Sequence, residues 1–97
     1  MLEKDIEKYL VSEVKKLNGV CLKLNSQSAN GVPDRLVLFK NQTSIFVELK
    51  KPGKKLRPLQ VYWKNGLTEL GFKSIKIDCK EDVDRLIEEA RDEICTT

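Results

Sequence analysis

The stretch Gly31–Gln60, GVPDRLVLFKNQTSIFVELKKPGKKLRPLQ, decides the fold of this chain. It contains two short apolar runs, Leu36–Phe39 and Ile45–Leu49, separated by the polar five-residue segment Lys40–Ser44. A connection of this length is typical of a β-hairpin. We therefore predict two antiparallel strands whose outer ends lie side by side.

Charged residues stand at the outer ends of both predicted strands. Asp34 precedes the first strand, and Glu48 and Lys50 close the second. Side chains two apart on a strand point to the same face, so Glu48 and Lys50 share a face and the hairpin brings Asp34 beside them. Two carboxylates and a substrate phosphate are ligands that magnesium prefers, and a lysine can orient water or stabilise charge on a phosphate. The pattern predicts metal-dependent chemistry on phosphate esters.

The motif at these positions resembles the PD-(D/E)XK nuclease signature: Pro33–Asp34, thirteen intervening residues, then Glu48–Lys50. The fuller string, Gly31–Arg35 with Glu48–Lys50 and Gln60, resembles the VRR-NUC family, specifically its small stand-alone phage members. The resemblance covers nearly the whole chain. It implies a PD-(D/E)XK restriction-endonuclease-like core and a metal-dependent DNA endonuclease that uses magnesium or manganese, without a nucleotide cofactor.

The resemblance also implies roles for single residues. Asp34, Glu48, the Leu49 carbonyl and a glutamate of the first helix would be the metal ligands. Lys50 would position the attacking water, and a supporting glutamine completes the site. The implied catalytic residues are Asp34, Glu48, Lys50, Glu7 and Gln60.

Two of these assignments have alternatives in the sequence. Glu7 lies about one turn into the first helix and matches the family's helix carboxylate best, with Glu3 as the alternative. Either glutamate would also be ordinary on a helix surface. Gln60 would equally serve as a structural hydrogen-bonding residue, because a buried amide needs partners.

The composition describes one small domain with an uneven charge distribution. The chain has 97 residues, of which 40% are hydrophobic and 34% charged, with a net charge of +3. We expect a single domain over residues 1–97. Acidic residues concentrate in Glu3–Glu13 and Asp78–Glu93, whereas the segment Lys50–Arg57 is basic and contains no acid. This asymmetry predicts a basic surface near Lys50 that faces a polyanion.

The predicted partner of that surface is DNA. Candidate phosphate contacts come from the basic segment, from the first two strands and from the turn-rich loop Asn25–Gly31, which also contains Asn30. The alternative is that the loop is a simple connection and the basic turn a solvated one. The candidates are Lys23, Ser26, Ser28, Arg35, Lys51, Lys54, Lys55 and Arg57.

Cysteine and histidine usage argues against a zinc site. The three cysteines, Cys21, Cys79 and Cys95, are widely spaced, and the chain has no histidine. The odd count and the lack of a signal peptide fit a reducing cytoplasm, so we expect an intracellular protein encoded by a bacterium or a phage. No apolar run approaches the roughly 20 residues that cross a bilayer, so no membrane is expected as partner.

The remaining pattern completes an α/β order. Helices are expected over Leu2–Leu17 and Leu56–Leu70 and after Asp78, and further strands over Val20–Leu24 and Phe72–Ile77. The second helix is expected to bury a stripe of four apolar residues. That stripe comprises Leu59, Trp63, Leu67 and Leu70. The predicted fold is a four-stranded mixed sheet flanked by helices in the order αβββαβα.

The expected substrate is branched DNA, such as a four-way (Holliday) junction processed during DNA repair. Cutting such a junction symmetrically requires two active sites, so we expect a homodimer. The third helix or the face near Val11 is a candidate contact. The alternatives are a monomeric nickase or flap nuclease, a non-catalytic DNA-binding module of the same fold, and a protein in which these charged residues form an ordinary ion-pair network.

Overall fold

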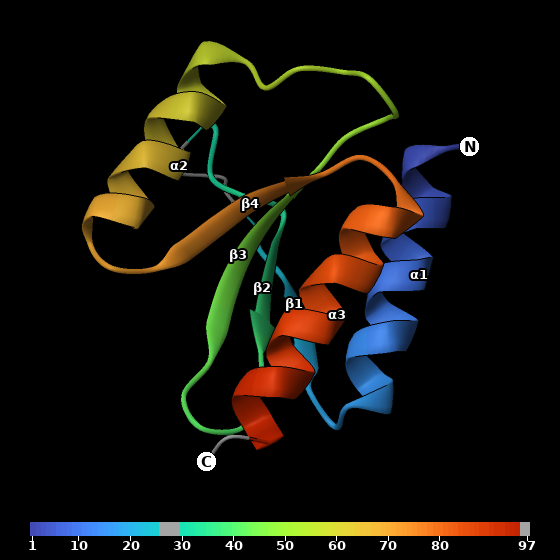
Figure 1. Ribbon diagram of the computed structural model, residues 1–97. Helices are drawn as coiled ribbons and strands as arrows, with labels where there is room; N and C mark the ends of the chain where they lie inside the picture. The colour runs from blue at the N-terminus through green and yellow to red at the C-terminus, as the bar shows by residue number, and fades with distance from the viewer. Residues whose placement is uncertain (26–29, 96–97) are drawn as a thin grey trace.

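The computed structural model describes residues 1–25 and 30–95. These residues form three helices and four strands in the predicted order, and Figure 1 shows their arrangement. The elements are α1 Glu3–Lys16, β1 Val20–Lys23, β2 Arg35–Leu38, β3 Ser44–Leu49, α2 Pro58–Glu69, β4 Lys73–Ile77 and α3 Lys80–Cys95. Each helix within the described ranges is too short or too polar to span a lipid bilayer. The predicted αβββαβα order is confirmed.

The sheet is mixed and has the strand order β1-β2-β3-β4. β1 pairs with β2 and β2 with β3 in antiparallel fashion, whereas β3 and β4 are parallel. The β2–β3 hairpin is closed by a hydrogen bond from the Phe39 N–H to the Thr43 carbonyl at 2.9 Å. Parallel strands cannot be joined by a tight turn, and α2 forms the crossover between β3 and β4.

α1 and α3 lie side by side on one face of the sheet and build the core with it (Figure 1). Alternation along β3 directs Ile45, Val47 and Leu49 into this core, where each is at most 3% exposed. The helices contribute stripes at helical spacing. These stripes are Ile6, Leu10 and Val14 of α1, and Val83, Leu86, Ile87 and Ala90 of α3.

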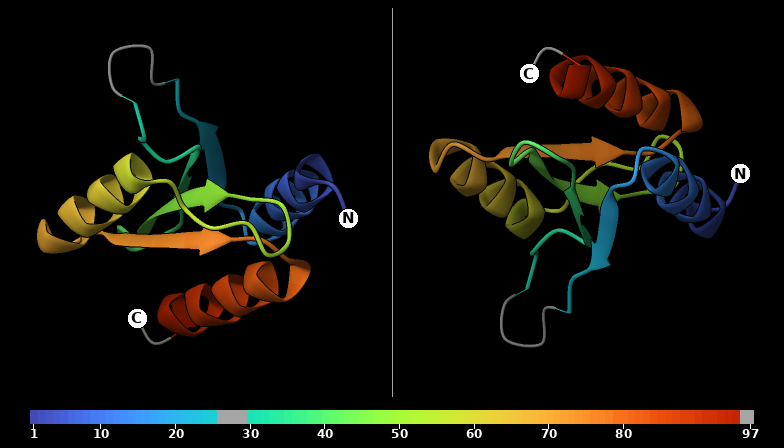
Figure 2. Two further views of the ribbon diagram at one scale, coloured as in Figure 1. Left: turned by 90° about the horizontal axis from the view of Figure 1, so that it is seen from above. Right: turned by 90° about the horizontal axis from the view of Figure 1, so that it is seen from below.

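α2 lies apart from the other two helices, next to β4 (Figure 2). The predicted buried stripe of this helix is wrong in part. Leu67 is buried, but Leu59 and Leu70 are 53% and 74% exposed. The helix turns Gln60 inward, because the Gln60 amide donates to the carboxylate of Glu48 at 2.8 Å. The flank that carries Leu59 and Leu70 therefore faces solvent.

Gly31 brings the loop before β2 against the start of α2. Its φ of 87° lies in the left-handed region, and a Cβ at this position would be 2.7 Å from the carbonyl carbon and oxygen of Leu59. Only glycine accommodates both the conformation and the close approach. The contact sets the distance between Asp34, three residues later, and the first turn of α2.

We predict that Gly31→Ala destabilises the protein more than Gly71→Ala. Gly71 has a similar φ of 93°, but a Cβ there would meet nothing within 4 Å. Gly71→Ala, the control, should lower the free energy of unfolding by about 1–2 kcal/mol, because alanine is strained in the left-handed region. Gly31→Ala should lower it further, because the added Cβ also displaces the start of α2. Urea midpoints of both variants measure the difference, and equal midpoints would show that the contact with Leu59 yields without cost.

Candidate active site

Asp34 and Glu48 converge at one end of the sheet, as the hairpin predicts. The last backbone pair of the hairpin is Arg35 with Val47, so Asp34 and Glu48 are the next residues along the two strands. The Asp34 carboxylate accepts a hydrogen bond from the Leu49 N–H at 2.8 Å. This bond holds one oxygen of Asp34 at the end of β3.

Glu48 is a buried carboxylate with one fixed oxygen and one free oxygen. Its side chain is 8% exposed, and Oε2 accepts a hydrogen bond from Gln60 at 2.8 Å. The Gln60 amide is itself oriented, because its oxygen accepts a 2.8 Å hydrogen bond from the Arg57 N–H. Among the described residues, Glu48 Oε1 is the one buried side-chain polar atom without a hydrogen-bond partner. A buried carboxylate oxygen of this kind is suited to bind a hard cation.

The surroundings of Glu48 favour its protonated form. Burial is the main cause and the charge of Asp34 the next, and together they raise the pKa of Glu48 to about 7. Lys50 opposes this increase in the pKa, and Glu3, from the first turn of α1, adds to it. Near neutral pH a proton and a divalent cation would therefore compete for the same carboxylate.

A cleft of about 590 Å³ opens beside the two carboxylates. It is lined by residues 30–32, by Asp34 and Glu48, and by residues 57–60. Lys50 follows directly on β3 and is 7% exposed, and its backbone N–H donates to the Ile77 carbonyl at 3.0 Å. The structure therefore places Asp34, Glu48, Leu49, Lys50 and Gln60 at one end of the sheet.

Glu7, the preferred helix carboxylate in the sequence interpretation, binds Arg35. Glu7 Oε2 lies 3.0 Å from Arg35 Nε and 2.9 Å from Nη2, and Arg35 Nη1 also donates to the Cys21 carbonyl at 3.2 Å. Arg35, proposed from the sequence as a phosphate contact, is therefore committed to an ion pair with α1. Glu3 is the glutamate of α1 whose charge raises the pKa of Glu48.

Most of the other predicted DNA contacts are exposed residues at the same end of the sheet or on the segment after β3. Lys51, Lys54, Lys55 and Arg57 are exposed on the segment that follows β3. Lys23 is exposed at the end of β1 and pairs through its backbone with Arg35, so it lies at the same end of the sheet. Ser26 and Ser28 lie outside the described residues. Asn30 is exposed and lines the cleft.

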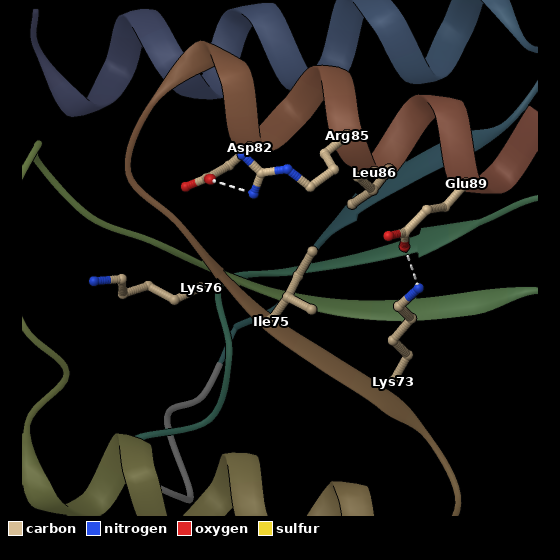
Figure 3. Close-up of a pocket in the computed structure, with 7 residues that line it drawn as sticks. All are labelled: Lys73, Ile75, Lys76, Asp82, Arg85, Leu86 and Glu89. Carbon is tan, nitrogen blue, oxygen red and sulfur yellow. Dashed lines mark hydrogen bonds and ion pairs between the residues drawn. The ribbon is translucent and has the colours of Figure 1, made fainter.

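A second cavity, of about 250 Å³, lies between β4 and α3 (Figure 3). Five charged groups line it, and four of them form ion pairs with one another. Lys73 contacts Glu89 at 2.6 Å and Arg85 contacts Asp82 at 3.2 Å. The fifth, Lys76, lies 3.5 Å from Asp78, so each charged group of this cavity has a partner of opposite charge.

Asp78, Cys79 and Asp82 form a further group of possible metal ligands, with ligand atoms within 4.8 Å of one another. The sequence interpretation did not single out this group. Asp78 accepts a hydrogen bond from the Gly53 N–H at 3.1 Å, and Asp82 accepts one from the Asp78 N–H at 3.2 Å. These carboxylates already bind backbone groups, which distinguishes them from Glu48.

Comparisons with known proteins agree with this architecture. No protein-family model matches the chain. Over 79 residues the chain is 46% identical to a protein of Acyrthosiphon pisum secondary endosymbiont phage 1 described as "Putative nuclease p44", covering 81% of this chain and 85% of the phage protein. A solved structure described as "VRR_NUC domain" superposes with a TM-score of 0.82 at 29% sequence identity, covering 89% of this chain and 94% of that chain. Both similarities extend over most of the chain.

The raised pKa predicts a pH-dependent effect of Glu48→Gln on stability. The folded protein retains a proton on Glu48 that the unfolded chain releases from about pH 4.5 upward, so the wild-type protein loses stability as the pH rises from 4.5 to about 7. Glu48→Gln has no titrating group at this position, so its stability does not fall for this reason. The melting temperature of Glu48→Gln minus that of the wild type should therefore increase from pH 4.5 to about 7 and level off above it.

Differential scanning fluorimetry in EDTA measures this difference. Glu88→Gln, which removes an exposed carboxylate of α3, is the matched control. Its melting temperature should differ from that of the wild type by the same amount at each pH. A difference between Glu48→Gln and wild type that stays constant with pH would show that Glu48 ionises normally in the folded protein.

Proposed function

Because the chain belongs to the VRR-NUC domain family, we propose that it is a metal-dependent endonuclease that hydrolyses phosphodiester bonds of DNA. The observation that carries this proposal is the buried Glu48 carboxylate, whose Oε1 has no hydrogen-bond partner among the described residues, next to Asp34. An ordinary ion-pair network would leave neither an orphaned oxygen nor a raised pKa at this position.

Asp34 and Glu48 would hold magnesium or manganese, with the Leu49 carbonyl as a further ligand. Such a cation supplies a Lewis acid for the phosphate and favours ionisation of a nearby water. Gln60 fixes the Glu48 carboxylate, and the Leu49 N–H fixes that of Asp34. Lys50 would orient the attacking water or stabilise the charge that develops on the phosphate.

Of the two α1 glutamates, we propose Glu3 for the supporting role near the metal, because the Glu7 carboxylate already pairs with Arg35. The charge of Glu3 is the last and smallest of the causes that act on the pKa of Glu48. The Glu7–Arg35 pair ties α1 to the start of β2, so it would hold Asp34 in place from behind. Glu7 then contributes to the position of the site and Arg35 contributes little to DNA binding.

We predict that Asp34→Asn, Glu48→Gln and Lys50→Ala each lower DNA cleavage by at least about 10²-fold, because each removes a charge that acts on the transition state. The asparagine oxygen can still accept the Leu49 N–H, so the fold should remain intact. Cleavage is measured with manganese on linear, nicked, flap and four-way-junction DNA, and circular dichroism reports folding.

A metal titration separates binding from catalysis in the same variants. Manganese should raise the melting temperature of the wild type and of Lys50→Ala, but not of Asp34→Asn. If the Lys50→Ala variant cleaves DNA at the wild-type rate, the catalytic role of Lys50 is refuted. Tight DNA binding without cleavage of any substrate would favour the alternative, a DNA-binding module.

We further propose that the protein is a homodimer that acts on branched DNA such as a four-way junction. Two strands are cut symmetrically only if two sites are held in a fixed relation, which a two-fold dimer provides. The exposed apolar residues of the described chain suggest where the contact lies. Apart from Met1 and Leu2, the large ones are Val20, Leu22, Leu59, Val61, Tyr62, Leu70 and Phe72.

Four of these residues lie on two surfaces that no described helix or strand covers. One is the outer flank of α2, where Tyr62 is 70% and Leu70 is 74% exposed. The other is the sheet face opposite α1 and α3, where Val20 and Leu22 of β1 are 50% and 44% exposed. The apolar stripe of α3 is buried and Val11 is half-buried, so neither suits the contact as well. A second copy seated on the outer flank of α2 would cover the more exposed of the two surfaces, and exposed apolar patches commonly mark such interfaces.

We predict that Tyr62→Glu combined with Leu70→Glu converts the dimer to a monomer. Leu70 lies at the end of α2 away from Gln60, and neither side chain belongs to the cleft. Sedimentation at micromolar concentration measures the state. Leu2→Glu, at the residue that directly precedes α1 and is 62% exposed, is the matched control and should remain dimeric. A monomeric wild type, alone and on DNA, would favour the nickase or flap-nuclease alternative.

A further inference from the structure

The basic segment Lys51–Lys55 forms a defined turn directly after the strand that carries Glu48. The Lys54 N–H donates to the Lys51 carbonyl at 3.0 Å, and Gly53 has a φ of 80°. Proline followed by a glycine with positive φ is the arrangement of a type II turn. All five residues are exposed, so Lys51, Lys54 and Lys55 leave a fixed backbone toward solvent.

Two side chains from the end of β4 hold this backbone. The Gly53 N–H donates to Asp78 Oδ2 at 3.1 Å, and Lys76 Nζ donates to the Lys54 carbonyl at 3.3 Å. Lys76 Nζ also lies 3.5 Å from Asp78 Oδ2. Figure 3 shows Lys76 extending away from the ion pairs between β4 and α3. The turn is therefore anchored at two consecutive residues by a mutually paired acid and base.

An acid at this position is unfavourable for binding a polyanion. Asp78 stands next to the most basic segment of the chain and opposes its attraction for phosphate. The Gly53 hydrogen bond is the main cause that lowers the pKa of Asp78, so the residue keeps its charge at neutral pH. The place of Asp78 at the basic surface is explained if the stabilisation of the turn outweighs the repulsion of phosphate.

We propose that Asp78, together with Lys76, is a positioning residue that orients the turn Lys51–Lys55 so that its lysines meet the DNA backbone next to the end of the strand that carries Glu48. This inference rests on the proposed function. The direction in which one substitution changes the DNA affinity distinguishes this role from a purely electrostatic one. Removing the acid strengthens DNA binding if Asp78 matters only through its charge, and weakens it if Asp78 orients the lysines.

The test is binding of a fluorescent DNA duplex to Asp78→Ala in EDTA, measured by anisotropy over a range of salt concentrations. The dissociation constant should rise by roughly three- to tenfold and the salt slope should fall by about one or two, since each phosphate contact contributes about one. Asp78→Asn keeps an oxygen for the Gly53 N–H and should restore most of the affinity. Asp92→Ala removes an exposed acid of α3 and should bind as tightly as wild type or more tightly.

Two further measurements tie the effect to the turn. In a background with Lys51, Lys54 and Lys55 replaced by serine, Asp78→Ala should weaken binding no further. Hydrogen exchange of the Gly53 amide, followed by NMR, should accelerate in Asp78→Ala and not in Asp92→Ala.

The possible outcomes distinguish this inference from the proposed function. Tighter DNA binding by Asp78→Ala, with the wild type binding normally, would overturn the inference alone. Weaker binding that persists in the serine background would also overturn it, because the effect would then not pass through the turn. A wild-type protein that binds no DNA would overturn the proposed function and this inference together.

Discussion

Burial of the Glu48 carboxylate is the constraint on which the rest of this structure depends. Alternation along β3 places its neighbours in the core and directs Glu48 to the opposite face, where it is 8% exposed. A carboxylate there requires a donor, and Gln60 supplies it. That bond sets the rotation of α2 about its axis and turns Leu59 and Leu70 outward. One hydrogen bond therefore relates the chemistry of the site to the apolar surface on the far side of the same helix.

The site is kept at some cost to the folded protein. Asp34 and Glu48 repel each other, and the buried Glu48 Oε1 has no hydrogen-bond partner within the part of the chain that the structure describes. Neighbouring contacts hold this arrangement: Arg35 binds Glu7 on the core side, and the Leu49 N–H holds Asp34. Functional sites commonly break the rules that the surrounding fold obeys. Here the broken rule is the pairing of buried charge, and a cation would restore it.

Local periodicity predicted the order of elements, the hairpin and the convergence of Asp34, Glu48 and Lys50, because neighbouring strands bring these residues together over a short loop. Partners distant in sequence were not predictable in the same way. The glutamate of α1 that binds Arg35 is 28 residues away from it, and periodicity does not encode such a pair. The rotation of α2 was mispredicted because apolar spacing alone assigns leucines to the core, and only the Gln60 bond decides otherwise.

The turn at residues 40–42 lies at the end of the hairpin opposite the site, and Asn41 and Gln42 hold positive φ values of 65° and 63° there. Its length sets which residues of β2 and β3 face each other. A strand that slips by one residue exchanges its two faces, so Glu48 would enter the core and Val47 would take its place. Length variation is usually tolerated at loop tips far from a functional site. In this fold a loop at the opposite end of the hairpin is instead restricted in length by the chemistry at the other end of the strand.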